Sequence, residues 1–92
     1  MLIIIKNVEL ELTNWLKDGK YRLAVLKLIA QESLLSSELA VKLNLNRASM
    51  SRILRNLKDK GLVDAITSGS RTVTYVITKR GKEALKPVYP DR

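Results

Sequence analysis

Hydrophobic residues recur at helical spacing in two neighbouring stretches of the chain, separated only by residues 44–46. The apolar faces consist of Leu39, Ala40 and Leu43 in the first stretch and of Met50, Ile53, Leu54 and Leu57 in the second. Ser36 is a strong N-cap residue, and Glu38 suits the positive end of a helix that begins there. Asn46 is a second capping residue, so the pattern predicts another helix from there to about Lys60.

The break between these two helices has the composition of a tight turn. Asn44 is one of the few residues besides glycine that tolerates a left-handed backbone conformation. Leu45 follows as an apolar plug for the turn, and the small Ala40 lets the second helix pack closely across the first. Two short helices joined in this way form a helix-turn-helix.

The chain before this motif contains a predicted helix that is apolar on most of its circumference. We expect it from Lys20 to about Gln31, with Asp18 or Gly19 at its start. Such a helix is buried on more than one side, so either another subunit or the N-terminal segment of the same chain covers it. That segment is expected to form a short helix from about Val8 to Lys17, although Leu2–Ile5 has the composition of a strand.

A glycine and a β-hairpin are expected after the motif. Gly61 stands where the glycine that follows a helix belongs. Two strands are predicted at Leu62–Thr67 and Thr72–Thr78, joined by a turn at Ser68-Gly69-Ser70. A short extended segment is expected at Ser33–Leu35, before the motif. After the hairpin, Thr78 caps a last helix that runs to Leu85 or Lys86, where Pro87 stops it. The tail from Pro87 to Arg92 is expected to be frayed.

Three blocks of the chain, RLAVLKLIA, SSELAVKLNLNRASMSRILRNLKDKGLV and TYVITKRGKEAL, resemble a known family. Together they cover about Gly19 to Leu85. Their most specific parts are Lys60-Gly61-Leu62-Val63 and the Tyr75…Thr78-x-x-Gly81 pattern. The resemblance is to winged helix-turn-helix transcription regulators, in particular to MarR- and ArsR-like regulators and small archaeal winged-helix proteins.

The resemblance implies an α+β, mostly helical winged helix-turn-helix fold, with a three-helix core plus a two-stranded β wing and extra terminal helical segments. It also implies a homodimer that binds double-stranded DNA as a repressor or an activator. The expected divisions are an N-terminal segment at 1–18 that serves in dimerisation, a DNA-binding domain at 19–86 and a flexible tail at 87–92. The chain departs from the family pattern in having Asn44 where glycine is commoner, and in lacking the long terminal dimerisation helices of MarR proteins.

Basic residues are concentrated in the second half of the chain. Residues 1–41 hold five basic and five acidic residues, whereas residues 42–92 hold twelve basic and four acidic ones, so the net charge of +8 lies entirely in the second part. A localised basic patch is typical of a protein that binds a polyanion. The alternative is that the charge only aids solubility, but solubility does not require such segregation.

The candidate DNA contacts lie on the second motif helix, at about 47–60, opposite its apolar face. Arg52 and Arg55 are neighbours there, and an arginine can bind guanine O6 and N7 bidentately. The alternative is a solvated face with an ion pair between Arg55 and Asp59. In the predicted wing at 62–78, Arg71 lies just beyond the tip and suits the backbone or a narrow minor groove. The expected DNA-binding residues are Ser36, Arg47, Ala48, Ser49, Ser51, Arg52, Arg55 and Arg71.

The chain contains no cysteine and no histidine, which excludes disulfides, a cysteine nucleophile, a Ser-His-Asp triad and a zinc site with the usual ligands. We therefore expect no enzymatic activity, no cofactor and no metal. The apolar run Met1–Ile5 is too short for a signal peptide or a membrane span, so a cytoplasmic, nucleoid-associated protein is expected. Two other functions stay open, namely a winged-helix protein-interaction module and a non-specific nucleoid or RNA-binding protein.

Overall fold

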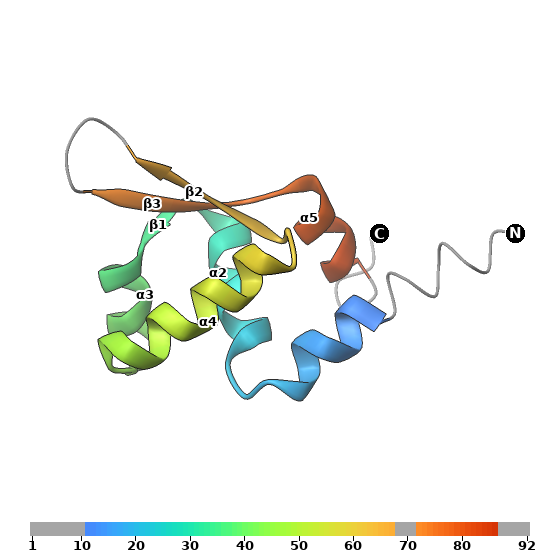
Figure 1. The fold of residues 1–92 in the computed structure, drawn as a ribbon, viewed down its shortest axis with the longest axis horizontal. Helices are drawn as coiled ribbons and strands as arrows, with labels where there is room; N and C mark the ends of the chain where they lie inside the picture. The colour runs from blue at the N-terminus through green and yellow to red at the C-terminus, as the bar shows by residue number, and fades with distance from the viewer. Residues whose placement is uncertain (1–10, 68–71, 87–92) are drawn as a thin grey trace, which may run out of the picture.

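The computed structural model describes residues 11–67 and 72–86 of the chain. Residues 11–18 are helical, and the elements that follow are α2 (Arg22–Gln31), β1 (Leu34–Leu35), α3 (Ser36–Leu43), α4 (Arg47–Asp59), β2 (Val63–Thr67), β3 (Val73–Ile77) and α5 (Lys79–Leu85) (Figure 1). The expected order of a helix, a short strand, two helices, a hairpin and a last helix is confirmed. The mostly helical α+β fold with a three-helix core of α2, α3 and α4 is confirmed with it.

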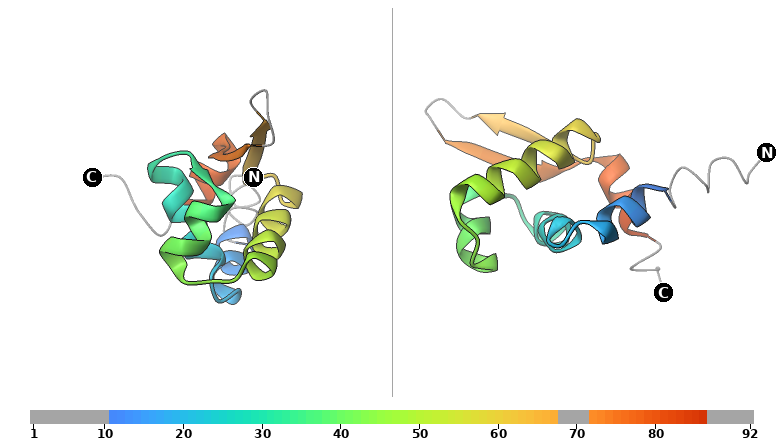
Figure 2. Two further views of the ribbon diagram at one scale, coloured as in Figure 1. Left: turned by 90° about the vertical axis from the view of Figure 1, so that its left-hand side faces the viewer. Right: turned by 60° about the horizontal axis from the view of Figure 1, so that its bottom comes forward.

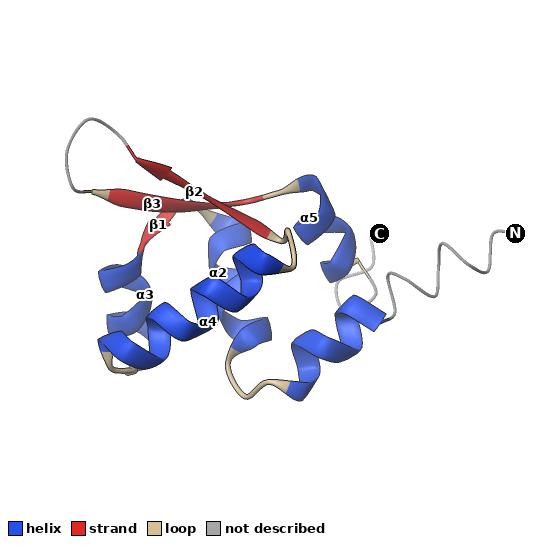
Figure 3. Ribbon diagram, in the orientation of Figure 1, coloured by secondary structure: helices blue, strands red, loops and turns tan. Residues whose placement is uncertain are grey.

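The three strands form one antiparallel sheet in the order β1-β3-β2 (Figure 3). β2 and β3 make the expected hairpin, and β1 adds a third strand that places Leu34 opposite Tyr75 and Leu35 opposite Thr74. The expected two-stranded wing is therefore joined to the helical part through a short strand that directly precedes α3. In Figure 1 and in the right-hand view of Figure 2, β2 and β3 run side by side along the upper edge of the molecule.

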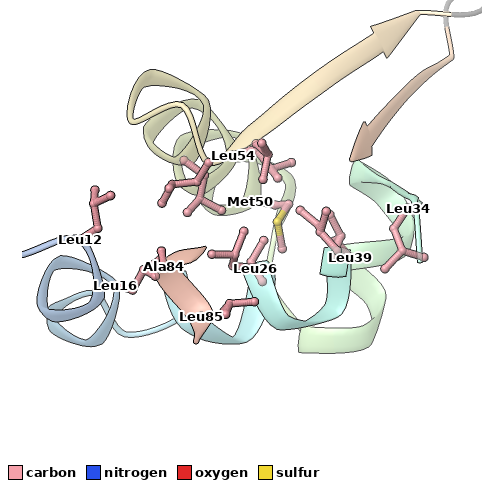
Figure 4. Packing of buried hydrophobic residues seen from close by; sticks show 14 of the residues in the cluster. Leu12, Leu16, Leu26, Leu34, Leu39, Met50, Leu54, Ala84 and Leu85 are labelled. Carbon is pink, nitrogen blue, oxygen red and sulfur yellow. The ribbon is translucent and has the colours of Figure 1, made fainter. Parts of the chain in front are cut away.

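The buried side chains form one cluster to which the helices and the sheet all contribute (Figure 4). Removing this apolar surface from water is the main favourable term in folding. The cluster consists of Leu12, Leu16, Val25, Leu26, Ile29, Leu34, Leu39, Ala40, Met50, Leu54, Leu57, Leu62, Val63, Ala84 and Leu85.

The helix at residues 11–18 is part of this core. Leu12 and Leu16 belong to the same buried cluster as the inner face of α2. Thr13 is also buried, and its Oγ1 donates a hydrogen bond to the carbonyl oxygen of Ala84 in α5 at 2.8 Å. The helix expected from about Val8 to Lys17 is thus confirmed within the described residues, where it continues to residue 18. The same chain therefore supplies part of the cover for the apolar α2.

Two predicted helix starts are wrong by one or two residues. α2 begins at Arg22 rather than at Lys20, because Lys20 and Tyr21 form the turn that leaves the preceding helix. Ser36 is the first residue of α3 and not its N-cap, a position that Leu35 occupies. Leu35 is extended because it pairs in β1, and its backbone N–H donates to Glu38 Oε1 at 2.8 Å, a bond at the helix start that does not involve the serine hydroxyl.

Several predictions fall outside the described residues. They are the strand alternative at Leu2–Ile5, the start of the first helix at Val8, the turn at Ser68-Gly69-Ser70, the position of Arg71, the stop at Pro87 and the tail from Pro87 to Arg92.

Candidate nucleic-acid interface

The turn between α3 and α4 has the predicted geometry. Asn44 adopts the left-handed conformation, with φ 55° and ψ 47°, and the backbone N–H of Leu45 donates to the carbonyl oxygen of Ala40 at 2.9 Å. Asn46 caps α4, since its Oδ1 accepts from the backbone N–H of Ser49 at 2.8 Å. These local bonds fix the direction in which α4 leaves the turn, and therefore the direction of every side chain along it.

α4 has one buried face and one exposed face, as its periodicity predicts. Met50, Leu54 and Leu57 are buried in the core. The opposite face is exposed and carries Ala48, Ser51, Arg52, Arg55 and Asp59. The two arginines therefore stand on the outer surface of the helix, available to a partner.

One side of α4 faces the hairpin across a hollow, which we call the hairpin-side hollow. Its lining consists of Leu35, Ser36, Ser37, Arg47, Ser51, Thr72, Val73 and Tyr75. Three of the predicted contact residues, Ser36, Arg47 and Ser51, are thereby brought together from α3 and α4. The hollow places hydroxyl groups and one guanidinium between the helix and the strand that leads to the hairpin tip.

The other side of α4 faces the turn before α2 across a second hollow, the loop-side hollow. Its lining consists of Gly19, Lys20, Tyr21, Arg22, Leu45, Ser49, Arg52, Ile53 and Asn56. It brings the predicted contacts Ser49 and Arg52 together with residues that the sequence did not indicate, namely Lys20, Arg22 and Asn56. The close pair of basic residues after Gly19 was visible in the sequence, but only the packing of α2 beside α4 reveals that it joins Arg52.

Arg22 is held in place by the preceding helix. Its Nη1 donates to the carbonyl oxygen of Trp15 at 2.8 Å, and its Cζ lies 4.1 Å from the centroid of the Trp15 ring. A cation over an aromatic face is attracted by the ring quadrupole, and Lys60 Nζ lies 5.3 Å from the same centroid. Gly19 leaves room for this arrangement, because a Cβ there would overlap the Arg22 side chain.

The hairpin is fixed at its base by a joint between the end of α4 and the start of α5. Gly61 takes the left-handed conformation after α4, with φ 77°. Thr78 Oγ1 donates to the Gly61 carbonyl oxygen at 2.7 Å and accepts from the Gly81 N–H at 3.0 Å, which confirms it as the cap of α5. The Thr78 N–H donates to the Leu62 carbonyl oxygen at 3.1 Å. A Cβ at Gly81 would overlap that same oxygen and lie 2.7 Å from Ile77 Cγ1, so only glycine fits.

The predicted contacts are thus distributed over α3 and three sides of α4. Ser36, Arg47 and Ser51 line the hairpin-side hollow, Ser49 and Arg52 line the loop-side hollow, and Ala48 and Arg55 lie on the exposed face between them. Among the residues that the structure describes, neither hollow has an acidic one in its lining. The local charge therefore favours an anionic partner over a cationic one.

Residues 11–67 and 72–86 contain no group of three or more His, Cys, Asp or Glu placed to hold a metal ion. In the same part of the chain, no helix combines the length and the apolar character that crossing a bilayer requires.

The winged helix-turn-helix family model matches residues 21–89 of the chain. No curated protein sequence matches this chain.

Solved structures with this fold include several bacterial proteins of low sequence identity. Reduced HlyU from Vibrio cholerae superposes with a TM-score of 0.75 at 23% identity, covering 99% of this chain and 100% of that one. MepR, a transcription regulator of the Staphylococcus aureus multidrug efflux pump MepA, gives 0.71 at 19% identity over 92% of this chain and 67% of that one. ZitR from Lactococcus lactis, in complex with DNA, gives 0.67 at 19% identity over 76% of this chain and 50% of that one. At such identities the likeness establishes the fold alone.

Proposed function

The chain belongs to the winged helix-turn-helix family, and from this premise we propose that it is a sequence-specific double-stranded DNA-binding transcription regulator. α4 enters the major groove as the recognition helix, and the hairpin lies on the flanking backbone or in the adjacent minor groove. In this proposal the protein regulates transcription by occupying its DNA site. The protein binds its target and catalyses no reaction.

The observation that carries this proposal is the position of Arg52 and Arg55 on the exposed side of a helix whose opposite face is buried. Guanidinium groups in this position suit the O6 and N7 acceptors of guanine, and Ala48 on the same side suits a thymine methyl group. The solved DNA complex of ZitR supports the proposal, because it shows that a protein with this fold binds DNA.

The remaining contacts are proposed to position the protein on the duplex. Hydroxyl groups and helix N-termini commonly bind phosphate oxygens, which sets the register without specifying bases. This role is assigned to Ser36, Arg47, Ser49 and Ser51, which line the two hollows beside α4. Arg71 is assigned to the backbone or minor groove next to the hairpin.

We propose that the protein binds as a homodimer. The buried Val25, Leu26 and Ile29 of α2 are covered within the chain, so the proposed contact uses the half-buried Ala24 and Leu28 together with the N-terminal segment at 1–18. Residues 19–86 form the DNA-binding unit in this proposal, and the protein is cytoplasmic and associated with the nucleoid. Sedimentation at micromolar concentration tests the dimer, which a clean monomer would overturn.

The function is tested by selecting bound duplexes from a random pool. We expect a palindromic consensus whose half-sites are about 34 Å apart, because a two-fold dimer places its recognition helices in successive major grooves. Duplexes bound without any shared sequence, with affinity that falls steeply as salt rises, would indicate a non-specific nucleoid or RNA-binding protein instead. Negligible affinity for duplexes at moderate salt would indicate a protein-interaction module.

A further inference from the structure

The loop-side hollow is chemically suited to an anion. Three of its lining residues are basic (Lys20, Arg22 and Arg52), and three others carry hydrogen-bonding side chains (Tyr21, Ser49 and Asn56). Within residues 11–67 and 72–86, no acidic residue lines this hollow. The hollow is therefore lined by hydrogen-bond donors and by positive charge. Two of its basic residues, Lys20 and Arg22, come from the part of the chain before residue 42, which has no net charge as a whole.

Arg22 and Lys20 have different roles in this hollow. Arg22 is committed to the preceding helix through its hydrogen bond to the Trp15 carbonyl oxygen and its position over the Trp15 ring. It therefore acts as part of the wall. Lys20 is exposed, and its Nζ lies 5.4 Å from the centroid of the Tyr21 ring, at the edge of the hollow. A flexible ammonium group in that position can turn towards a ligand.

The position of the hollow relative to α4 identifies the source of the anion. A helix with its side chains is about 10–12 Å across, and the major groove of B-DNA is about 12 Å wide. A recognition helix in this groove therefore has a phosphate backbone on each of its two sides. The hairpin lies on one side of α4, and the loop-side hollow lies on the other.

We propose that the loop-side hollow binds one phosphate of the DNA backbone, on the edge of the major groove away from the hairpin, with Lys20 as its principal ligand. The segment at residues 19–22 is then a further DNA-contacting part of the protein, besides α3, α4 and the hairpin. This inference rests on the proposed function, since it assumes that α4 lies in the major groove.

The experiment compares Lys20→Gln with Lys86→Gln. Both variants remove one exposed positive charge, but Lys86 follows α5 and does not line the hollow. Binding is measured across a range of salt concentrations, on the selected duplex and on an unrelated duplex of equal length. For Lys20→Gln we expect affinity to fall on the order of threefold on both duplexes, with an unchanged consensus. The slope of the logarithm of the binding constant against the logarithm of the salt concentration should become shallower by about one. For Lys86→Gln we expect the wild-type slope.

A second measurement identifies the phosphate itself. Single phosphates of the selected duplex are replaced one at a time by uncharged methylphosphonates, and each duplex is tested with the wild type and with Lys20→Gln. We expect one position at which the replacement weakens the wild type but has no further effect on the variant. Such non-additivity is the mark of a direct contact.

The outcomes separate the inference from the function on which it rests. If Lys20→Gln and Lys86→Gln have equal salt slopes, or if no phosphate couples to Lys20, the contact is wrong while the proposed function stands. If the wild type binds both duplexes equally, sequence specificity is wrong, and the salt slopes still decide the role of Lys20. If the wild type binds neither duplex, both proposals are wrong.

Discussion

The two sides of α4 are held in place by different kinds of interaction. On the hairpin side, the β2–β3 ladder and the backbone bond from the Thr78 N–H to the Leu62 carbonyl oxygen are joined by the Thr78 hydroxyl, which bonds to Gly61 and Gly81. On the loop side, the neighbouring segment is fixed by a side chain, Arg22, which rests on the ring and the carbonyl oxygen of Trp15.

The base of the hairpin therefore has a fixed position relative to α4, whereas the loop side mainly supplies positive charge. Backbone hydrogen bonds and close packing leave the base of the hairpin little freedom, so its angle to α4 is set before any partner binds. Besides the anchored Arg22, the loop side presents the exposed Lys20 and Arg52, whose side chains lose rotamer freedom when they meet a ligand. We therefore expect changes at the base of the hairpin to act mainly on stability, and changes at the exposed basic side chains of the loop side to act mainly on binding.

The largest expected effect comes from filling the joint on the hairpin side. Gly81→Ala places a methyl group against the Leu62 carbonyl oxygen and Ile77, neither of which can move away without shifting the strand. We expect a loss of about 1–3 kcal/mol in the free energy of unfolding, measured by urea denaturation. Gly19→Ala is the comparison variant, because its methyl group displaces the Arg22 side chain rather than a backbone atom and should cost no more than the loss of that anchor, about 1 kcal/mol. If both alanines destabilise the protein equally, the contrast between the two sides is wrong.

The next effect is on base recognition. Arg52→Ala should weaken binding to the preferred duplex by about 1–3 kcal/mol and relax the base preference at one position. Arg47→Ala, on the hairpin side, should weaken all duplexes alike because we assign it to phosphates. Competition binding with single-base variants of the selected duplex measures both. If Arg52→Ala binds the preferred duplex as tightly as the wild type does, the assignment of Arg52 is wrong.

A smaller effect is expected where the loop side is anchored. Arg22→Leu removes the hydrogen bond to the Trp15 carbonyl oxygen and the cation from the ring, and should lower the free energy of unfolding by about 1 kcal/mol. Thermal and urea unfolding both report this change. Lys20→Gln should leave the unfolding curve unchanged, and a shift as large as that of Arg22→Leu would mean that Lys20 is part of the anchor.

The smallest effect is expected at the hairpin tip. Arg71→Ala should weaken binding on the order of threefold on every duplex, with a shallower salt dependence and the same consensus. Filter binding at several salt concentrations measures this. A changed consensus would instead assign base or shape recognition to Arg71, and would give the hairpin side a share in specificity.

The features that the sequence predicts well are those that depend on neighbours along the chain. Asn44 in the turn, Asn46 and Thr78 as caps, and Gly61 after α4 all act within about four residues of themselves. The division of α4 into a buried and an exposed face is equally local, because it follows from helical periodicity alone.

The features that the sequence misses depend on contacts between distant segments. Ser36 has the composition of a cap, but the pairing of Leu35 with Thr74 supplies the extended residue that starts α3. The loop-side hollow exists only because the turn at Lys20 packs beside Arg52, and no periodicity within either segment indicates that meeting. The sequence therefore predicts the exposed face of α4, but not the two hollows that flank it.

The joint at Thr78 has a consequence for how this chain can be altered. Because both roots of the hairpin are tied to the ends of α4 and α5, we expect a loop of different length or charge between β2 and β3 to leave the position of the recognition helix unchanged. The hairpin tip is then an exchangeable module. Tips taken from other proteins of this fold could be grafted between Thr67 and Thr72, so that affinity for the flanking DNA is tuned while the bases that α4 recognises stay the same.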